Sequence, residues 1–220
     1  MRLIHKIHNL LFPPKCILCK KVLQDDETDL CHSCRTEIQE HPSTTIKLPY
    51  LAKWCALWYY EEKVRGSLLR FKFSNARSYS KVYGAMLAVK LQRELPDFDI
   101  LTWVPISRLR KWRRGYDQVY LIAQTVAAEL GVAPVPTLKK VRNNPPQSRL
   151  GDASRRRANV LGAYRAINPQ ALEGKHVLLL DDIITTGATA GECARVLLTA
   201  GAKEVHCAAV AVASHQQKKQ

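Results

Sequence analysis

The sequence predicts an α/β protein with a mostly parallel sheet flanked by helices, preceded by a small cysteine-rich module. The apolar run at 177–180 is typical of a strand buried on both faces of a parallel sheet. A helical pattern and a second apolar run, at 203–213, follow it and complete one strand–helix–strand unit. The chain has 220 residues, of which 46% are hydrophobic, so it can form one α/β domain and a small accessory module.

The charge and the apolar patterning limit the functional classes. The net charge is +15, which favours polyanionic partners such as nucleic acid, phosphorylated metabolites or acidic lipid, but also fits a basic protein that is simply soluble. No apolar run is long enough to cross a membrane. The opening "MRLIHKIHNLLFPP" is too interrupted for a secretory signal. We therefore expect a cytoplasmic protein with no membrane insertion.

The first 45 residues predict a short helix and a metal module. Apolar residues recur at helical spacing between Leu3 and Leu11, as in a helix that docks on another surface. Two knuckles follow, "CILC" and "CHSC", and in a reducing compartment such clusters favour a metal over disulfides. Four thiolates in symmetric pairs favour structural zinc over an iron–sulfur cluster, with chance pairs or a redox couple as alternatives. The predicted zinc ligands are Cys16, Cys19, Cys31 and Cys34.

Residues 50–214 are predicted to form the larger domain, and residues 215–220 are predicted to form a flexible tail. Periodicity and the Pro and Gly residues that end each pattern predict the elements in order. The three other cysteines, Cys55, Cys193 and Cys207, lie in apolar surroundings and are interpreted as core thiols. The expected elements are a strand at 57–60, helices at 64–69 and 78–95, a strand at 100–104, and helices at 119–130 and 190–200.

A basic stretch, "ISRLRKWRRGYDQ", follows the strand at 100–104. Guanidinium groups with interleaved aromatic rings, Trp112 and Tyr116, suit the phosphates and bases of single-stranded nucleic acid. They equally suit a pyrophosphate at the end of a strand, or a solvated basic loop. The basic residues are Arg108, Arg110, Lys111, Arg113 and Arg114.

A second basic segment, 143–157, has no steady period and is rich in turn residues. It contains Arg155, Arg156 and Arg157. A long irregular segment within an α/β domain is either a mobile functional loop or a disordered insert, and we favour the mobile loop.

The stretch "VLLLDDIITTGAT" predicts a ligand site. Asp181 and Asp182 follow the apolar run, and ligands bind at the carboxyl ends of strands in open α/β sheets. Residues 185–189 form the turn into a helix N-terminus, where exposed N–H groups bind phosphate and Gly187 permits close approach. The two acids can accept hydrogen bonds from hydroxyls or hold Mg²⁺ directly or through water. A ribose 5-phosphate bearing a 1-pyrophosphate engages all these groups.

Three other interpretations of this stretch are weaker. The chain lacks the G-x-x-x-x-G-K-[ST] loop of P-loop ATPases. An acidic pocket of the receiver type has no need for a Thr-Thr-Gly-Ala-Thr turn. The third alternative is that the two acids belong to a turn that only caps a helix and have no functional role.

The same stretch resembles the phosphoribosyl pyrophosphate (PRPP) signature of type I phosphoribosyltransferases. With "LFPPKC", "RFKF", "VPISRLRKWRRGYDQ", "PPQSRL" and "RRRANVLGAY", the chain resembles the ComF family of competence proteins from Phe12 to Val212. This resemblance implies a Rossmann-like type I phosphoribosyltransferase fold joined to an N-terminal zinc ribbon.

The resemblance also implies roles for individual residues. Asp181 and Asp182 would bind the ribose diol, contact Mg²⁺ indirectly and be the catalytic pair of any transfer reaction. The segment 143–157 would occupy the place of the mobile catalytic loop. The implied 5-phosphate contacts are Thr185, Thr186, Gly187, Ala188 and Thr189, and the implied pyrophosphate loop is Pro105, Ile106, Ser107 and Arg108.

Two functions follow from the resemblance. The first is a protein of DNA uptake in natural transformation that binds PRPP with Mg²⁺, and binds single-stranded DNA through its arginines beside a helicase or recombination mediator. The second is an active phosphoribosyltransferase for an unidentified nucleobase, amine or nucleic-acid acceptor.

The chain departs from the family pattern in having one set of four cysteines where many relatives have a second. It also has Gly115-Tyr116-Asp117-Gln118 in place of Gly-Phe-Asn-Gln.

Overall fold

The structure, a computed structural model, describes residues 13–43, 46–143 and 158–214. Three predicted features fall outside these ranges: the helix within the first 12 residues, nearly all of the segment 143–157 with its three arginines, and the tail at 215–220.

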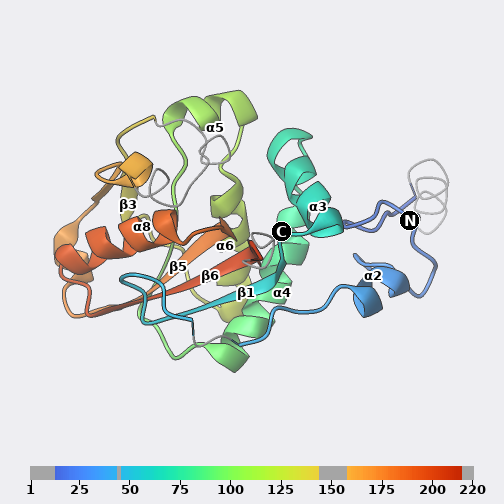
Figure 1. Cartoon of the computed structure of the whole chain (residues 1–220), viewed down its shortest axis with the longest axis horizontal. Helices are drawn as coiled ribbons and strands as arrows, with labels where there is room; N and C mark the ends of the chain where they lie inside the picture. The colour runs from blue at the N-terminus through green and yellow to red at the C-terminus, as the bar shows by residue number, and fades with distance from the viewer. Residues whose placement is uncertain (1–12, 44–45, 144–157, 215–220) are drawn as a thin grey trace, which may run out of the picture.

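A four-stranded parallel sheet forms the centre of the molecule (Figure 1). The strands β5 and β6 are buried along almost their whole length, as expected of inner strands of a parallel sheet. In spatial order the strands are β1 (Lys53–Tyr59), β6 (Glu204–Val212), β5 (His176–Ile184) and β2 (Ile100–Trp103).

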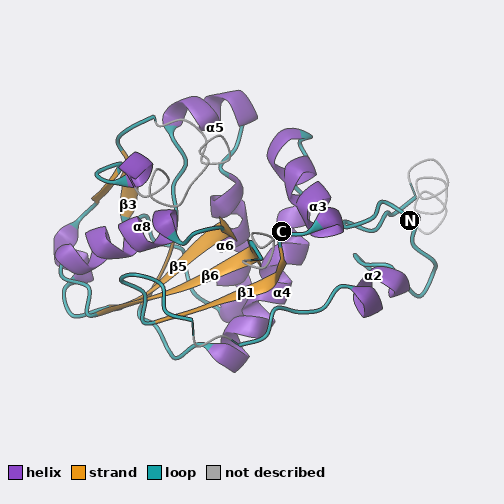
Figure 2. Cartoon of the chain, viewed as in Figure 1, coloured by secondary structure: helices purple, strands orange, loops and turns teal. Residues whose placement is uncertain are grey.

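Helices cover both faces of this sheet (Figure 2). One face packs against α3 (Glu62–Phe73), α4 (Tyr79–Glu94) and α6 (Gln118–Leu130). The other face packs against α8 (Ala188–Thr199) and a small antiparallel sheet of β3 (Leu138–Lys140) and β4 (Tyr164–Ala166). A short 3-10 helix, η2 (Pro169–Leu172), precedes β5.

Local sequence signals explain the ends and the packing of α6. The Asp117 carboxylate accepts hydrogen bonds from the backbone N–H groups of Val119 and Tyr120, which caps the start of α6. Helix α6 packs against α4 at Gly84, where an added Cβ would lie 2.4 Å from the Cβ of Thr125 of α6. The close approach of α4 to α6 therefore requires glycine at position 84.

Strand β5 is longer than the sequence predicts. The prediction that the strand ends at Leu180 is wrong, because β6 stays paired with β5 as far as Ile184 and Val212. On the other side, β2 ends at Trp103, opposite Leu180. Asp181 and Asp182 therefore lie within β5 but beyond the end of its β2 neighbour, and this step in the sheet opens one side of the strand to a ligand.

The basic stretch after Pro105 is helical, which corrects the interpretation of a loop. Helix α5 (Arg108–Arg114) is capped by the Ser107 hydroxyl, which accepts from the Arg110 N–H, and ends at Gly115 in the left-handed conformation. None of its seven residues is buried. The small sheet of β3 and β4 was also not predicted, because three-residue strands show too few alternations to be recognised.

The cysteine module packs against α3. It contains isolated antiparallel bridges and a short helix, α2 (His32–Glu37). The Ser67 hydroxyl donates to the carbonyl of Ile17 at 2.6 Å, and the Arg70 guanidinium donates to the carbonyls of Ile17 and Leu18 at 2.7 Å each. The buried residues of this module belong to the same hydrophobic cluster as α3, α4 and α6.

Candidate functional site

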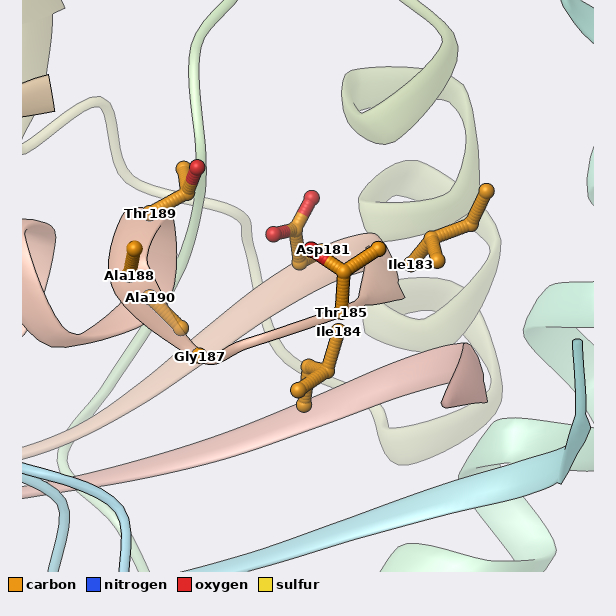
Figure 3. Close-up of a pocket in the computed structure, with 8 residues that line it drawn as sticks. All are labelled: Asp181, Ile183, Ile184, Thr185, Gly187, Ala188, Thr189 and Ala190. Carbon is orange, nitrogen blue, oxygen red and sulfur yellow. The ribbon is translucent and has the colours of Figure 1, made fainter. Parts of the chain in front are cut away.

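A hollow lies between the end of β5 and the first turn of α8. Figure 3 shows the Asp181 carboxylate on the side of β5 that faces this turn, across from Thr189. The residues that line the hollow are Asp181, Ile183, Ile184, Thr185, Gly187, Ala188, Thr189 and Ala190. The structure thus brings together the acid Asp181 and most of the turn 185–189 that the sequence singled out.

The turn into α8 has the properties of an anion site. Gly187 adopts a φ of 72°, and a Cβ there would lie 2.8 Å from Leu48, so only glycine fits. The first turn of α8 presents backbone N–H groups at the positive end of the helix dipole, which favours an anion beside them. The Thr186 hydroxyl is buried and, among the described residues, has no hydrogen-bond partner. A phosphate group beside this helix end would accept hydrogen bonds from N–H and hydroxyl groups of the turn.

The two acids have different partners. Asp182 is engaged at both oxygens: Lys72 of α3 donates to one at 2.9 Å, and Gln118 of α6 donates to the other at 2.8 Å. Asp181 accepts the backbone N–H of Asp182 at 2.8 Å. The chain therefore neutralises Asp182 with its own cation and leaves Asp181 without an ion-pair partner among the described side chains.

This difference separates the pKa values of the two carboxyls. Burial, and then the neighbouring charge of Asp182, raise the pKa of Asp181 to about 8. Burial also opposes ionisation of Asp182, but Lys72 and the hydrogen bond from Gln118 hold its pKa below the ordinary value. Near neutral pH, Asp182 is the ionised member of the pair and Asp181 carries a proton that it can release.

Sequence reasoning missed several residues at this site. Lys72 lies in "RFKF" and Gln118 in "GYDQ", so the motifs were recognised without a role for these side chains. Lys140 of β3 donates to the Tyr164 hydroxyl of β4 at 3.1 Å, and burial with the nearby Arg110 lowers the pKa of Lys140 to about 8. Asp181 acts on both Lys140 and Tyr164 electrostatically, which connects the small sheet to the acid pair.

The predicted pyrophosphate loop follows β2, the strand beside β5. Ser107 is buried, and its hydroxyl donates to the Asn143 side chain at 2.9 Å. The Ile106 N–H donates to the Asp117 carboxylate at 3.4 Å. Since β2 and β5 are parallel neighbours, Pro105 to Arg108 lie at the same edge of the sheet as the acid pair.

The basic residues of α5 form an exposed surface that also contains aromatic rings. Trp112 is 80% exposed and Phe73, at the end of α3, is 68% exposed. The Arg114 guanidinium lies 4.9 Å from the centre of the Phe73 ring. The aromatic-basic surface, as used below, consists of Phe73, Arg108, Lys111, Trp112, Arg113 and Arg114. Arg155, Arg156 and Arg157, predicted to share its function, lie outside the described residues.

The four cysteines of the two knuckles meet at one point. Their sulfur atoms all lie within 4.8 Å of one another, and those of Cys19 and Cys31 are 3.5 Å apart. Sulfurs around tetrahedral zinc lie about 3.8 Å apart, given zinc–sulfur bonds of about 2.3 Å. Burial opposes ionisation of Cys16, but hydrogen bonds from nearby backbone N–H groups lower its pKa to about 7. The donor set and its spacing fit zinc.

A magnesium ion fits the acid pair less well. Mg²⁺ requires oxygen ligands in octahedral geometry. Both oxygens of Asp182 already accept hydrogen bonds, and the pKa of Asp181 is raised. Direct coordination by Asp182 therefore does not fit this arrangement, and the acids suit only an ion that is held through water.

The fold and this site define a class of protein. A parallel sheet with an acid pair near a strand end and a glycine–threonine turn opening the next helix is the core of a type I phosphoribosyltransferase domain. In agreement, residues 119–220 match the family model described as phosphoribosyl transferase domain, and residues 7–45 match the one described as double zinc ribbon domain.

Full-length relatives identify the family. The chain is 28% identical over 215 residues to competence protein F of Haemophilus influenzae, covering 87% of this chain and 93% of the relative. It is 28% identical over 223 residues to DNA utilization protein YhgH of Salmonella typhi, covering 89% and 96%. The chain belongs to the family that contains competence protein F, ComFC and YhgH, with an N-terminal zinc ribbon and a phosphoribosyltransferase domain.

Among solved structures, one similar chain is described as the allosteric regulatory enzyme of purine biosynthesis. It is 27% identical, with a TM-score of 0.40 over 60% of this chain, and this chain spans only 25% of its length. Within the part of the chain that the structure describes, no helix is long and apolar enough to cross a membrane.

Proposed function

We propose that this chain handles DNA in competence or DNA utilization by binding PRPP in the hollow beside α8 and single-stranded DNA on the aromatic-basic surface. The relatives are named for competence and for DNA utilization. The observation that carries the PRPP half of the proposal is the hollow that Asp181, Gly187 and the first turn of α8 line, with the unpartnered Thr186 hydroxyl in the same turn.

The site suits each part of PRPP. The 5-phosphate binds at residues 185–189, where helix N–H groups, Gly187 and threonine hydroxyls meet. The ribose hydroxyls donate to the carboxyl groups of Asp181 and Asp182. The pyrophosphate faces the loop from Pro105 to Arg108, near the positive charges of Arg110 and Lys140. Mg²⁺ would enter with the ligand and neutralise charge on its pyrophosphate, and Asp181 and Asp182 would hold it only through water.

Calorimetric titration of PRPP into the zinc-loaded full chain tests this half of the proposal. Thr186→Val removes the unpartnered hydroxyl and keeps the shape of the side chain, so we expect affinity to fall about tenfold or more. The melting temperature should stay equal or rise, because a buried polar group without a partner disappears. Asp182→Asn should also weaken binding.

A matched control is Thr199→Val at the exposed far end of α8, which should leave PRPP affinity unchanged. Equal affinity in wild type and Thr186→Val would contradict the phosphate assignment. No saturable PRPP binding by the wild type would contradict the PRPP proposal as a whole.

The DNA half rests on exposure and charge. An exposed tryptophan lowers solubility, so it often marks a surface that contacts a partner. Trp112 lies among guanidinium groups that can neutralise phosphates. Stacking on one ring is worth about 1–3 kcal/mol per base. We expect Trp112→Ala to weaken binding of single-stranded oligonucleotides about tenfold with an unchanged salt dependence, and Arg113→Ala to reduce that dependence.

Fluorescence anisotropy across a salt series measures both effects. The control is Lys203→Ala, which removes one exposed positive charge at the opposite edge of the sheet. A salt slope near zero for the wild type, or equal losses in the control and Arg113→Ala, would contradict DNA binding by this surface.

One observation favours the alternative function, an active phosphoribosyltransferase. A carboxyl with a pKa near the working pH suits general acid–base catalysis, and the pKa of Asp181 is raised to about 8. In this reaction the acceptor forms a bond to the anomeric carbon as the bond to pyrophosphate breaks, and the ionised form of Asp181, which predominates above about pH 8, takes the acceptor's proton. Pyrophosphate release that depends on an added nucleobase, amine or nucleic acid, and that is lost in Asp181→Asn, would support it. No release with any acceptor would contradict it.

A further inference from the structure

A second cluster of metal-binding side chains lies at the other edge of the main sheet. His176 begins β5, and Glu204 begins β6 directly beside it in the parallel register. His206 follows two residues later on β6, on the same face as Glu204 because side chains alternate along a strand. Figure 1 shows these strand starts at the opposite end of β5 and β6 from the arrowheads, so this cluster is separate from the acid pair.

The three side chains have the spacing of metal ligands. The candidate ligand atoms all lie within 4.8 Å of one another. The Glu204 carboxylate oxygen is 3.3 Å from Nδ1 of His176 and 3.7 Å from Nε2 of His206. Nitrogen and oxygen ligands around tetrahedral zinc lie about 3.4 Å apart, given bonds of about 2.0–2.1 Å. Small side-chain rotations would bring all three to one ion.

The state of His206 is an independent reason to expect a ligand. This residue is 2% exposed, and neither of its ring nitrogens has a hydrogen-bond partner among the described residues. Buried polar groups nearly always have a partner, because leaving one without a partner destabilises the fold. The 3.7 Å to Glu204 is too long for a hydrogen bond. A metal ion between His206 and Glu204 would give a partner to Nε2 of His206, the nitrogen that faces the carboxylate.

The surroundings allow access and hold the ligands in place. His176 and Glu204 are each about one-third or more exposed, so the cluster is open to solvent on one side. The Asp99 carboxylate accepts the backbone N–H of His176 at 2.8 Å and anchors the start of β5. The charged or titratable groups that act on His206 are Glu204, His176 and Lys53, which lies opposite His206 on β1. The negative charge of Glu204 offsets the positive charge of Lys53 near His206.

We propose that His176, Glu204 and His206 bind a divalent transition-metal ion of the zinc type, with a fourth position open to water or an external ligand. Two imidazoles and one carboxylate favour Zn²⁺, Co²⁺ or Ni²⁺ over Mg²⁺ and Ca²⁺, which require oxygen ligands. The ion links the first residues of β5 and β6. It is distinct from the ion of the four cysteines, which lie in the N-terminal module.

The competing explanation is an ordinary His176–Glu204 ion pair beside a histidine that has no function. Such a pair accounts for the 3.3 Å contact but leaves both nitrogens of His206 without partners. The two explanations differ in what they predict for metal stoichiometry, because an ion pair binds no second ion.

The test is a titration of Co²⁺ into the full chain whose cysteine centre is already filled with zinc. Cobalt bound to cysteine gives intense thiolate charge-transfer bands, whereas cobalt bound to histidine and carboxylate gives visible bands without them. We expect one further equivalent to bind with the second type of spectrum and to raise the melting temperature. His176→Gln and Glu204→Gln, at partly exposed positions where the fold should persist, should each weaken this binding more than about tenfold.

The matched control is Glu129→Gln, an exposed glutamate of α6, which should bind cobalt as the wild type does. Two outcomes would overturn the proposal. One is the absence of a second equivalent in the wild type. The other is second-site binding that both His176→Gln and Glu204→Gln leave unchanged, which would place the ion elsewhere.

Discussion

The cysteine centre and the acid pair differ in how they compensate negative charge. Each gathers groups that become negative and that repel one another once ionised. At the cysteine centre, four sulfurs converge within 4.8 Å and fit a metal from outside the chain. At the acid pair, Asp182 is paired with Lys72 at 2.9 Å and Asp181 is kept from ionising near neutral pH. The first region therefore depends on an ion, while the second region carries its own countercharge.

This comparison predicts different sensitivities. A centre completed by an external ion should fail when the ion is removed, and its failure should be large because the ion organises the surrounding chain. A centre completed by a side chain should tolerate chelators but respond to substitution of that side chain and to pH.

The largest expected effect is at the cysteine centre. Cys16→Ser removes one of four ligands, so we expect loss of one zinc equivalent and a free energy of unfolding lower by at least about 3 kcal/mol. Metal analysis and thermal denaturation measure both. Cys55→Ser, a buried cysteine of β1 outside the module, should keep the zinc. Zinc retained by Cys16→Ser would refute the assignment of this ligand.

The next effect is at Lys72. Lys72→Met leaves the buried Asp182 carboxylate without its cation, which should lower the free energy of unfolding by about 3 kcal/mol at pH 7 in urea denaturation. Lys72→Met/Asp182→Asn should recover most of this loss, because the uncompensated charge is gone. A double variant no more stable than Lys72→Met would mean that packing, not charge, explains the effect.

The pH dependence of this effect has a definite sign. In the wild type, the lowered pKa of Asp182 contributes stability above the unfolded-state pKa, near 3.9, and this contribution disappears as pH falls through the folded-state pKa. The wild type and Lys72→Met should therefore converge in stability as the pH is lowered below about 4.

The smallest expected effect is at Asp181 and has the opposite sign. Because its pKa is raised to about 8, folding is favoured by the proton, and stability falls as pH rises from about 4 through about 8. Asp181→Asn removes this dependence. We expect it to gain about 2 kcal/mol over the wild type at pH 8.5 relative to pH 6.5, measured by urea denaturation at both values. A constant difference between the two proteins would contradict the raised pKa.

The sequence predicted the parts of the site that are continuous in the chain. The unit from β5 through α8 to β6 has a buried run, a glycine turn and a helical stripe, each a strong local signal. The cysteine knuckles have metal-ligand spacing in the sequence itself. The fold class and the zinc ribbon, predicted from these features and from the family resemblance, are confirmed by the two family models.

The rest of the site depends on residues far apart in the chain. Lys72 meets Asp182 across 110 positions, and nothing in its own helix marks it as the partner of a carboxylate. Helix α5 was missed because its seven residues have no apolar stripe, although Ser107 and Gly115 are recognisable caps. The strands β3 and β4 pair across an intervening segment that is longer than both together.

Helix α3 contacts both the cysteine module and the acid pair, and this restricts how either part can change in evolution. Through Ser67 and Arg70 it donates to carbonyls of the cysteine module, and two residues later Lys72 donates to Asp182. A descendant that lost the N-terminal module would expose those donors and the apolar side of the helix that supplies the acid pair with its cation. Exchange of either part by recombination would need compensating changes in α3 at the same time.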